Sequence, residues 1–117
     1  STTDVQDYLK LMETGECKKC DLVFAVLEFA ELSGANLGFA NLRGAFMGEA
    51  NLTRANLKDA DLTAARLYNV NLKDADLTDA NLSSIDLSDS DLTGAIMKGT
   101  TLCNTIMPGG SVIYSGC

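Results

Sequence analysis

The stretch from Asn51 to Leu82, NLTRANLKDADLTAARLYNVNLKDADLTDANL, has a leucine at every fifth residue without an exception. A helix places equivalent side chains about every 3.6 residues and a strand every 2, so neither produces a strict period of five. The spacing therefore indicates a structural repeat whose unit is five residues long.

The same period extends far beyond this stretch. Eighteen consecutive units run from Cys20 to Gly109 without an insertion, and fifteen have Leu at the central position. The other three central residues are Met47, Met97 and Met107. The residue two places earlier is small, Ala in twelve units, and the residue just before the centre is most often Asn or Asp. The unit is thus A-(D/N)-L-x-x.

The unit predicts one side of a square coil. Its small residue and its leucine are two apart, so both side chains point to the same face of an extended segment. The remaining positions must contain a corner, for which Gly, Asn, Asp and Ser are suited. Four corners close a coil of twenty residues, and coils stack at about 4.8 Å. The repeat then forms about four and a half coils around a leucine interior.

These eighteen units resemble the pentapeptide-repeat proteins, whose signature is the A-(D/N)-L-x-x unit. The resemblance implies an all-β solenoid, namely a right-handed quadrilateral β-helix with an N-terminal α-helical cap. We expect three parts: an N-terminal helical cap (1–19), the β-helix (20–109) and a C-terminal cap (110–117). Departures from the signature, such as Val26 and Phe46, are expected to form irregular turns or contact patches.

Both ends of a solenoid expose its core and need caps. Residues 2–15, TTDVQDYLKLMETG, predict an amphipathic helix with Thr2 or Thr3 as its N-cap. An apolar stripe at helical spacing is expected to cover the first coil, although a membrane or partner helix is the alternative. Three phenylalanines of the first coil should help to seat this helix, and the C-terminal tail should plug the other end. These residues are Val5, Tyr8, Leu9 and Met12 for the stripe, Phe24, Phe29 and Phe39 for the seat, and Val112, Ile113 and Tyr114 for the plug.

The four cysteines are expected to pair locally. Cys20 and Cys103 are about four coils apart, or roughly 20 Å, which is too far for one disulfide or one zinc site. The pairs are therefore Cys17 with Cys20 and Cys103 with Cys117, each joining a cap to the body. Structural disulfides, a redox-active Cys17–Cys20 pair and free thiols all remain open. Two disulfides imply an oxidising compartment. With its helical cap and paired cysteines, the chain most resembles the family members of the thylakoid lumen. A bacterial periplasm would fit the same cysteines.

Composition excludes several classes of function. A net charge of −7 argues against a nucleic-acid surface. No apolar run is long enough to insert into a membrane. The chain has no His and no Trp, and no nucleophile with a visible base, phosphate loop or cofactor motif, so we expect neither an enzyme nor a cofactor or metal site. It begins without Met at a polar segment, as expected of a processed product.

Val26 and Phe46 suggest how the protein acts. They are twenty residues apart, so they should form one apolar strip on adjacent coils, a candidate contact site for an unknown protein partner. We therefore expect a monomeric, non-catalytic scaffold that binds a protein in the thylakoid lumen. Two alternatives remain. The resemblance implies an acidic DNA mimic that binds DNA gyrase, and Cys17 and Cys20 suggest a thiol redox protein.

Overall fold

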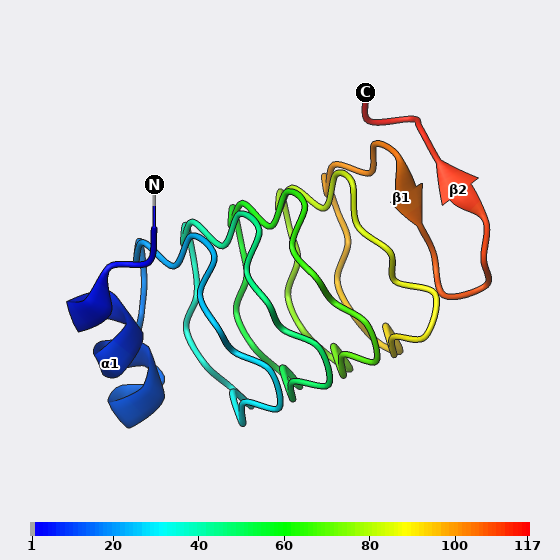
Figure 1. The fold of residues 1–117 in the computed structure, drawn as a ribbon. Coiled ribbons are helices and arrows are strands. Elements are labelled where there is room, and N and C mark those ends of the chain that lie inside the picture. The colour runs from blue at the N-terminus through cyan, green and yellow to red at the C-terminus, as the bar shows by residue number, and fades with distance from the viewer. Residues whose placement is uncertain (1) are drawn as a thin grey trace.

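The coils pair in parallel at a separation of twenty residues. In the computed structural model, which describes residues 2–117, a parallel bridge joins Asp21 to Asn41, and the same step recurs on all four sides of the coil. The Leu22 N–H donates to the Asn41 carbonyl at 2.8 Å, and the Asn41 N–H donates to the Cys20 carbonyl at 2.9 Å. Figure 1 shows the resulting stack, which measures 37 × 27 × 22 Å with its caps.

Each side of the coil is five residues long and ends in a β-turn. At one corner the Ala25 N–H donates to the Leu22 carbonyl at 3.0 Å, and Phe24, the third residue of that turn, has a φ of 59°. A left-handed φ recurs at the equivalent residue of most units. Glycine, Asn and Asp adopt it readily, which explains their frequency at this position.

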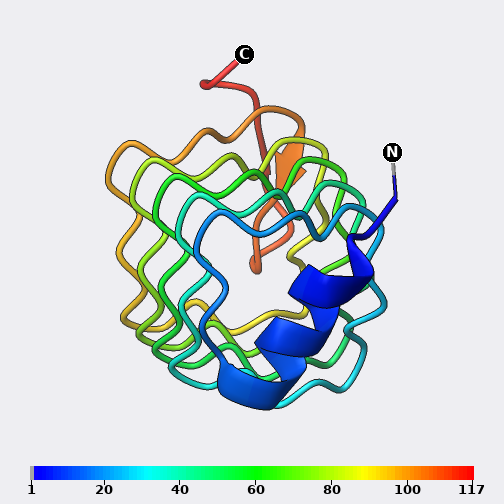
Figure 2. The ribbon, with the colours of Figure 1, turned by 90° about the vertical axis from the view of Figure 1, so that its left-hand side faces the viewer.

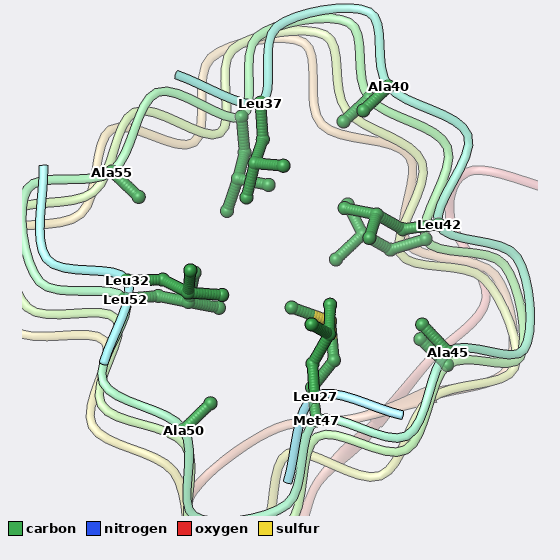
Figure 3. Close-up of a cluster of buried hydrophobic side chains, with 14 of the residues drawn as sticks. Leu27, Leu32, Leu37, Ala40, Leu42, Ala45, Met47, Ala50, Leu52 and Ala55 are labelled. Carbon is green, nitrogen blue, oxygen red and sulfur yellow. The ribbon is translucent and has the colours of Figure 1, made fainter. Parts of the chain in front are cut away.

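The interior is filled by the central residues of the units. Leu27, Leu32, Leu37 and Leu42 point inward from the four sides (Figure 3) and are at most 4% exposed. The alanines two residues earlier, such as Ala40 and Ala45, line the same interior near the corners. The inward placement predicted for the leucines is confirmed.

The parallel pairing begins before the expected start of the repeat. Glu16 forms a parallel bridge with Asn36, and the Cys17 N–H donates to the Asn36 carbonyl at 2.8 Å. Cys17 therefore stands where a unit has its leucine, and it is fully buried. The sequence pattern hides this unit because its centre is neither Leu nor Met.

Helix α1 (Val5–Thr14) lies across the N-terminal end of the stack (Figure 2). Its N-cap is Asp4, whose carboxylate accepts from the Asp7 N–H at 3.0 Å, rather than Thr2 or Thr3. Gly15, with a φ of 73°, ends the helix. The expected N-cap was wrong because the Thr3 hydroxyl is used to donate to the Val23 carbonyl at 2.7 Å, which joins the helix to the first coil.

The expected inner face of α1 was wrong except at Tyr8, which packs against the buried core. Leu11 is its buried residue, whereas Val5, Leu9 and Met12 are 66%, 43% and 46% exposed. The helix is rotated because the Asp7 carboxylate accepts from the Asp21 N–H at 2.8 Å. This hydrogen bond turns the side of the helix that carries Asp7 and Leu11 toward the coil.

The phenylalanines of the first coil do not seat the helix. Phe24, Phe29 and Phe39 are 52%, 67% and 53% exposed, because they occupy corner positions whose side chains point away from the interior. Phe24 instead lies against the backbone of Gly44 on the next coil, where an added Cβ would come within 2.4 Å of the ring.

At the other end, the chain leaves the stack through a short hairpin. Strands β1 (Thr105–Ile106) and β2 (Val112–Ile113) pair antiparallel. The expected plug is incomplete, because Val112 and Tyr114 remain 43% and 62% exposed. Pairing with β1 holds the tail beside the last coil, so the central residues there are only half-buried. These are Leu92, Met97, Leu102 and Met107.

Candidate functional site

Three sides of the coil carry columns of Asn and Asp that stabilise the turns. All eleven units with Asn or Asp before the central residue place its side-chain oxygen on the backbone N–H two residues further on. In the Asn56 unit, for example, the Lys58 N–H donates at 3.0 Å. These side chains therefore have a structural role in the turns.

The fourth side lacks this hydrogen bond on three successive coils. Val26, Phe46 and Arg66 occupy the Asn/Asp position there, and none of their side chains carries a hydrogen-bond acceptor. We call residues 26–29, 46–49 and 66–69 of this side the aromatic face. The side returns to the general pattern only at Asp86, which accepts from the Ser88 N–H at 2.9 Å.

The structure brings the two predicted contact residues together. Parallel bridges join Val26 to Phe46 and Phe46 to Arg66, so the three form one column along the rod. Val26 is 62% exposed, and the Arg66 guanidinium lies over the Phe46 ring, 5.2 Å from its centroid. A guanidinium stacked on an aromatic ring is held in place while its N–H groups stay available to a ligand.

Tyr68 is the third aromatic residue of this face, after Phe29 and Phe46. Its ring lies directly on Gly48, where a Cβ would come within 2.0 Å of the ring, and its hydroxyl hydrogen-bonds to the Glu28 carboxylate two coils away. This hydrogen bond, partial burial and the nearby charge of Glu28 and Glu49 raise the pKa of the Tyr68 hydroxyl, against the opposing effect of Arg66. Gly48 is therefore required for the ring to lie flat across the coil.

A shallow groove of about 360 Å³ adjoins the aromatic face. Arg66 and Tyr68 form one part of its lining, and Ala64, Ser84 and Asp86 line it further along. The groove therefore combines an arginine and an aromatic ring, both enriched at protein-binding surfaces, with a carboxylate.

The cysteines lie in the two local pairs that the spacing predicted. The Cα atoms of Cys17 and Cys20 are 5.2 Å apart, and those of Cys103 and Cys117 are 4.9 Å apart, both within the range for a disulfide. Cys17 and Cys20 are at most 3% exposed beneath helix α1. A protein substrate has no access to their sulfur atoms in this arrangement.

Within residues 2–117, no group of three or more His, Cys, Asp or Glu side chains is arranged to hold a metal ion. No helix among these residues is long and apolar enough to cross a membrane.

Sequence reasoning found two residues of the aromatic face and missed three. Phe29 was assigned to the seat of the helix, and Arg66 and Tyr68 were not assigned to the contact site, although all three lie on the same side of the coil as Val26. The signal that could have found them is the Asn/Asp position itself, since three successive units of one side depart from it.

The architecture defines a class of protein, a quadrilateral parallel β-helix built from five-residue sides. The sequence profile described as pentapeptide repeats, with eight copies, matches residues 20–59, 30–69 and 71–109. The chain belongs to the pentapeptide-repeat family. Proteins of this family fold as right-handed quadrilateral β-helices and are generally non-catalytic. None of the curated proteins searched matches the chain.

Several solved structures are similar to this chain. HetL, a pentapeptide repeat protein involved in heterocyst differentiation regulation in the cyanobacterium Nostoc, is 35% identical with a TM-score of 0.52, over 84% of this chain and 51% of HetL. A thylakoid-lumen protein of Arabidopsis thaliana is 22% identical (TM-score 0.47, 78% of this chain, 64% of that one). A second Nostoc protein is 30% identical (TM-score 0.46, 80% and 75%). This chain thus spans about half the length of HetL.

Proposed function

We propose that this protein is a non-catalytic scaffold that binds another protein through the aromatic face. The main observation behind this proposal is a missing hydrogen bond in the turns. Every Asn and Asp at this position makes it, whereas Val26, Phe46 and Arg66, on three successive coils, cannot. Each such bond is worth about 0.5–1.5 kcal/mol. A side that forgoes this stabilisation and presents an apolar, aromatic and cationic column is suited to recognition.

The chemistry of the face supports this role. Aromatic residues and arginine are enriched at the centres of protein interfaces, where they bury large areas with little loss of rotamer freedom. The rigid parallel ladder fixes their spacing, so a partner meets a pre-formed surface. We propose that the protein presents it as a monomer, a rod of about four and a half coils.

The proposed compartment is an oxidising one, the thylakoid lumen, with a periplasm as the alternative. Its support is the local pairing of all four cysteines at disulfide distance. Disulfides persist in oxidising compartments and are rare in the cytosol. The Cys103–Cys117 pair joins the C-terminal tail to the last coil, whereas the Cys17–Cys20 pair lies within the first coil rather than between cap and body. Both pairs lie at ends of the stack, where a solenoid is most prone to fray.

Site-directed photocrosslinking tests the binding role. A photoreactive phenylalanine analogue is placed at Phe46, or at Ile96 as the control, which has the same position in its unit and is 52% exposed on another side. In extract of the source cells we expect discrete protein adducts from position 46 and none of the same mass from position 96. Identical adducts from both positions, or none from either, would contradict the proposal.

Peptide mapping under non-reducing conditions tests the compartment. In protein taken from its native source, with thiols blocked at lysis, we expect Cys17–Cys20 and Cys103–Cys117 peptides and no free thiol. Free thiols at all four positions would remove the support for an oxidising compartment.

The two alternatives predict different results. A thiol redox protein would reduce insulin disulfides in a reaction lost in Cys17→Ser, and we expect no such activity because Cys17 and Cys20 are buried. A DNA mimic would affect supercoiling by gyrase at micromolar concentration. We expect no effect, since basic residues such as Arg54, Lys58 and Lys73 interrupt the acidic surface.

A further inference from the structure

The aromatic face continues onto helix α1. The outer stripe of the helix, Val5, Leu9 and Met12, is exposed and lies outside the buried core. Tyr8 lies between this stripe and the first coil, and its hydroxyl donates to the Val26 carbonyl at 3.2 Å. Helix α1 therefore adjoins the aromatic face at Val26, through Tyr8, and the stripe and the face both belong to the N-terminal part of the rod.

The spacing of this surface matches an α-helix better than a strand. Successive coils present Val26, Phe46 and Arg66 about 4.8 Å apart, so the column extends about 9.6 Å. One face of an α-helix repeats every 5.4 Å, which brings two turns to within about 1 Å of this length. One face of a strand repeats about every 6.7 Å, which after two steps is about 4 Å out of register.

The charges around the surface select a cationic partner. Glu28 and Glu49 lie beside Tyr68 and affect its titration, and Asp86 lines the adjoining groove. The units on this side contain no lysine, and Arg66, their one cation, lies over Phe46. A segment with basic residues flanking its apolar anchors would thus find Glu28 and Glu49 beside the column and Asp86 at its end.

We propose that the aromatic face and the outer stripe of α1 bind a cationic amphipathic α-helix of the partner protein, which lies along the axis of the rod. Its apolar side covers Val26, Phe46 and the stripe, and its lysines or arginines face Glu28, Glu49 and Asp86. This inference rests on the proposed function and specifies the chemistry of the partner.

Fluorescence anisotropy with defined peptides tests the proposal. The probe is a labelled leucine–lysine peptide of about 15 residues with leucines at i, i+3, i+4 and i+7. Two further peptides replace lysine by glutamate or scramble the order of the residues. At physiological salt, we expect the cationic amphipathic peptide to bind at least about tenfold more tightly than either of the others.

Matched variants separate this contact from general attraction to an acidic protein. Phe46→Asn and Leu9→Asn should each weaken binding of the leucine–lysine peptide about tenfold or more. Ile96→Asn makes the same kind of change at the same position of a unit on another side, where Ile96 is exposed and Phe46 is half-buried, and it should leave the affinity within about twofold. Circular dichroism verifies that each variant is folded.

Several results would overturn the proposal. They are equal affinity for all three peptides, equal loss of binding in Ile96→Asn and Phe46→Asn, or binding to phosphatidylcholine vesicles that Phe46→Asn abolishes, which would indicate a membrane surface. If position 46 captures a discrete partner by photocrosslinking but the leucine–lysine peptide does not bind, the scaffold function stands and the cationic helix is wrong. If neither occurs, both are wrong.

Discussion

At the scale of the residue, the corner positions show most clearly where folding and binding compete. Phe29 has a φ of 61° and is 67% exposed. Left-handed backbone costs a residue with a Cβ roughly 1 kcal/mol relative to glycine, and an exposed ring recovers little of this. Glycine occupies the same kind of corner at Gly34 and Gly44. Phenylalanine at Phe29 is therefore unfavourable for folding, as residues kept for recognition often are.

Replacing Phe29 by glycine should stabilise the protein. We expect Phe29→Gly to raise the free energy of unfolding by about 0.5–1 kcal/mol, because strain is removed and little buried area is lost. Gly34→Ala, at a corner with a φ of 71° and open space around it, should have the opposite sign. Urea titration measures both. Destabilisation of more than about 1 kcal/mol by Phe29→Gly would mean that the ring packs in the fold.

The leucines of the interior should differ along the rod. Leu62 is fully buried, whereas Leu102 in the last coil is half-buried. We expect Leu62→Ala to lower the free energy of unfolding by about 3–5 kcal/mol, and Leu102→Ala by about half as much or less. Leu62→Asp should prevent folding, because it buries an unpaired charge. Equal effects of the two alanine substitutions would contradict the open end seen beside the hairpin.

At this scale the sequence predicted the interior and failed at the surface. A central leucine points inward because the period of five leaves it one consistent direction. An apolar residue at a corner, such as Phe24, is ambiguous, since hydrophobicity suggests burial while the position in the unit imposes exposure. Phe24 is exposed in the structure, because the backbone of the turn determines where its side chain points.

At the scale of the element, helix α1 shows how capping contacts override an amphipathic pattern. The stripe Val5–Leu9–Met12 is the more apolar side, yet Leu11 is the residue that covers the coil. Hydrogen bonds from Thr3 and to Asp7 determine the rotation of the helix. Such side-chain contacts to another segment have no signature in the helical period, so the sequence could not predict the inner face.

Two leucines of this helix therefore form a matched pair. Leu11→Ala should lower the free energy of unfolding by about 2–4 kcal/mol, because Leu11 is 1% exposed over the first coil. Leu9→Ala, at 43% exposure, should change it by less than about 1 kcal/mol. Thermal or urea unfolding monitored by circular dichroism distinguishes them. A larger effect at Leu9 than at Leu11 would restore the face expected from the sequence.

The turns give the stability a dependence on pH. Burial raises the pKa of the Asp61 carboxyl, but hydrogen bonds from the Thr63 hydroxyl and N–H, together with Arg43 at 3.2 Å, lower it below its ordinary value of 3.8. A lowered folded-state pKa means that these contacts stabilise the fold above pH 3.8, and that this contribution is lost as the pH falls through the folded-state pKa.

Thr63→Val tests this dependence. At pH 7 it should lower the free energy of unfolding by about 0.5–1 kcal/mol, and the difference from wild type should shrink below about pH 4. The control is Ser83→Ala, because the Ser83 hydroxyl donates at 2.6 Å to Asn81, whose amide does not titrate. Its effect should be independent of pH. The account fails if the effect of Thr63→Val is equally constant between pH 7 and pH 3.

At the scale of the whole molecule, the period of five predicted the β-helix because each unit repeats the same local geometry and pairs with the unit twenty residues away. The ends departed from prediction. The first unit is centred on Cys17 and the tail pairs with Thr105–Ile106, and neither feature repeats. The sequence predicted part of the candidate site. Val26 and Phe46 stood out as apolar residues, whereas Arg66 and Tyr68 can be assigned to the site only from their contacts with residues on adjacent coils.

The central claim is that the column Val26, Phe46, Arg66 serves binding rather than folding. The most direct measurement is the free energy of unfolding of the triple variant Val26→Asn/Phe46→Asn/Arg66→Asn, which restores the side-chain acceptor that the other sides carry. We predict a value equal to wild type or up to about 1.5 kcal/mol higher, with loss of the crosslinked partner. A variant less stable by more than about 1 kcal/mol would make the column structural and contradict the account.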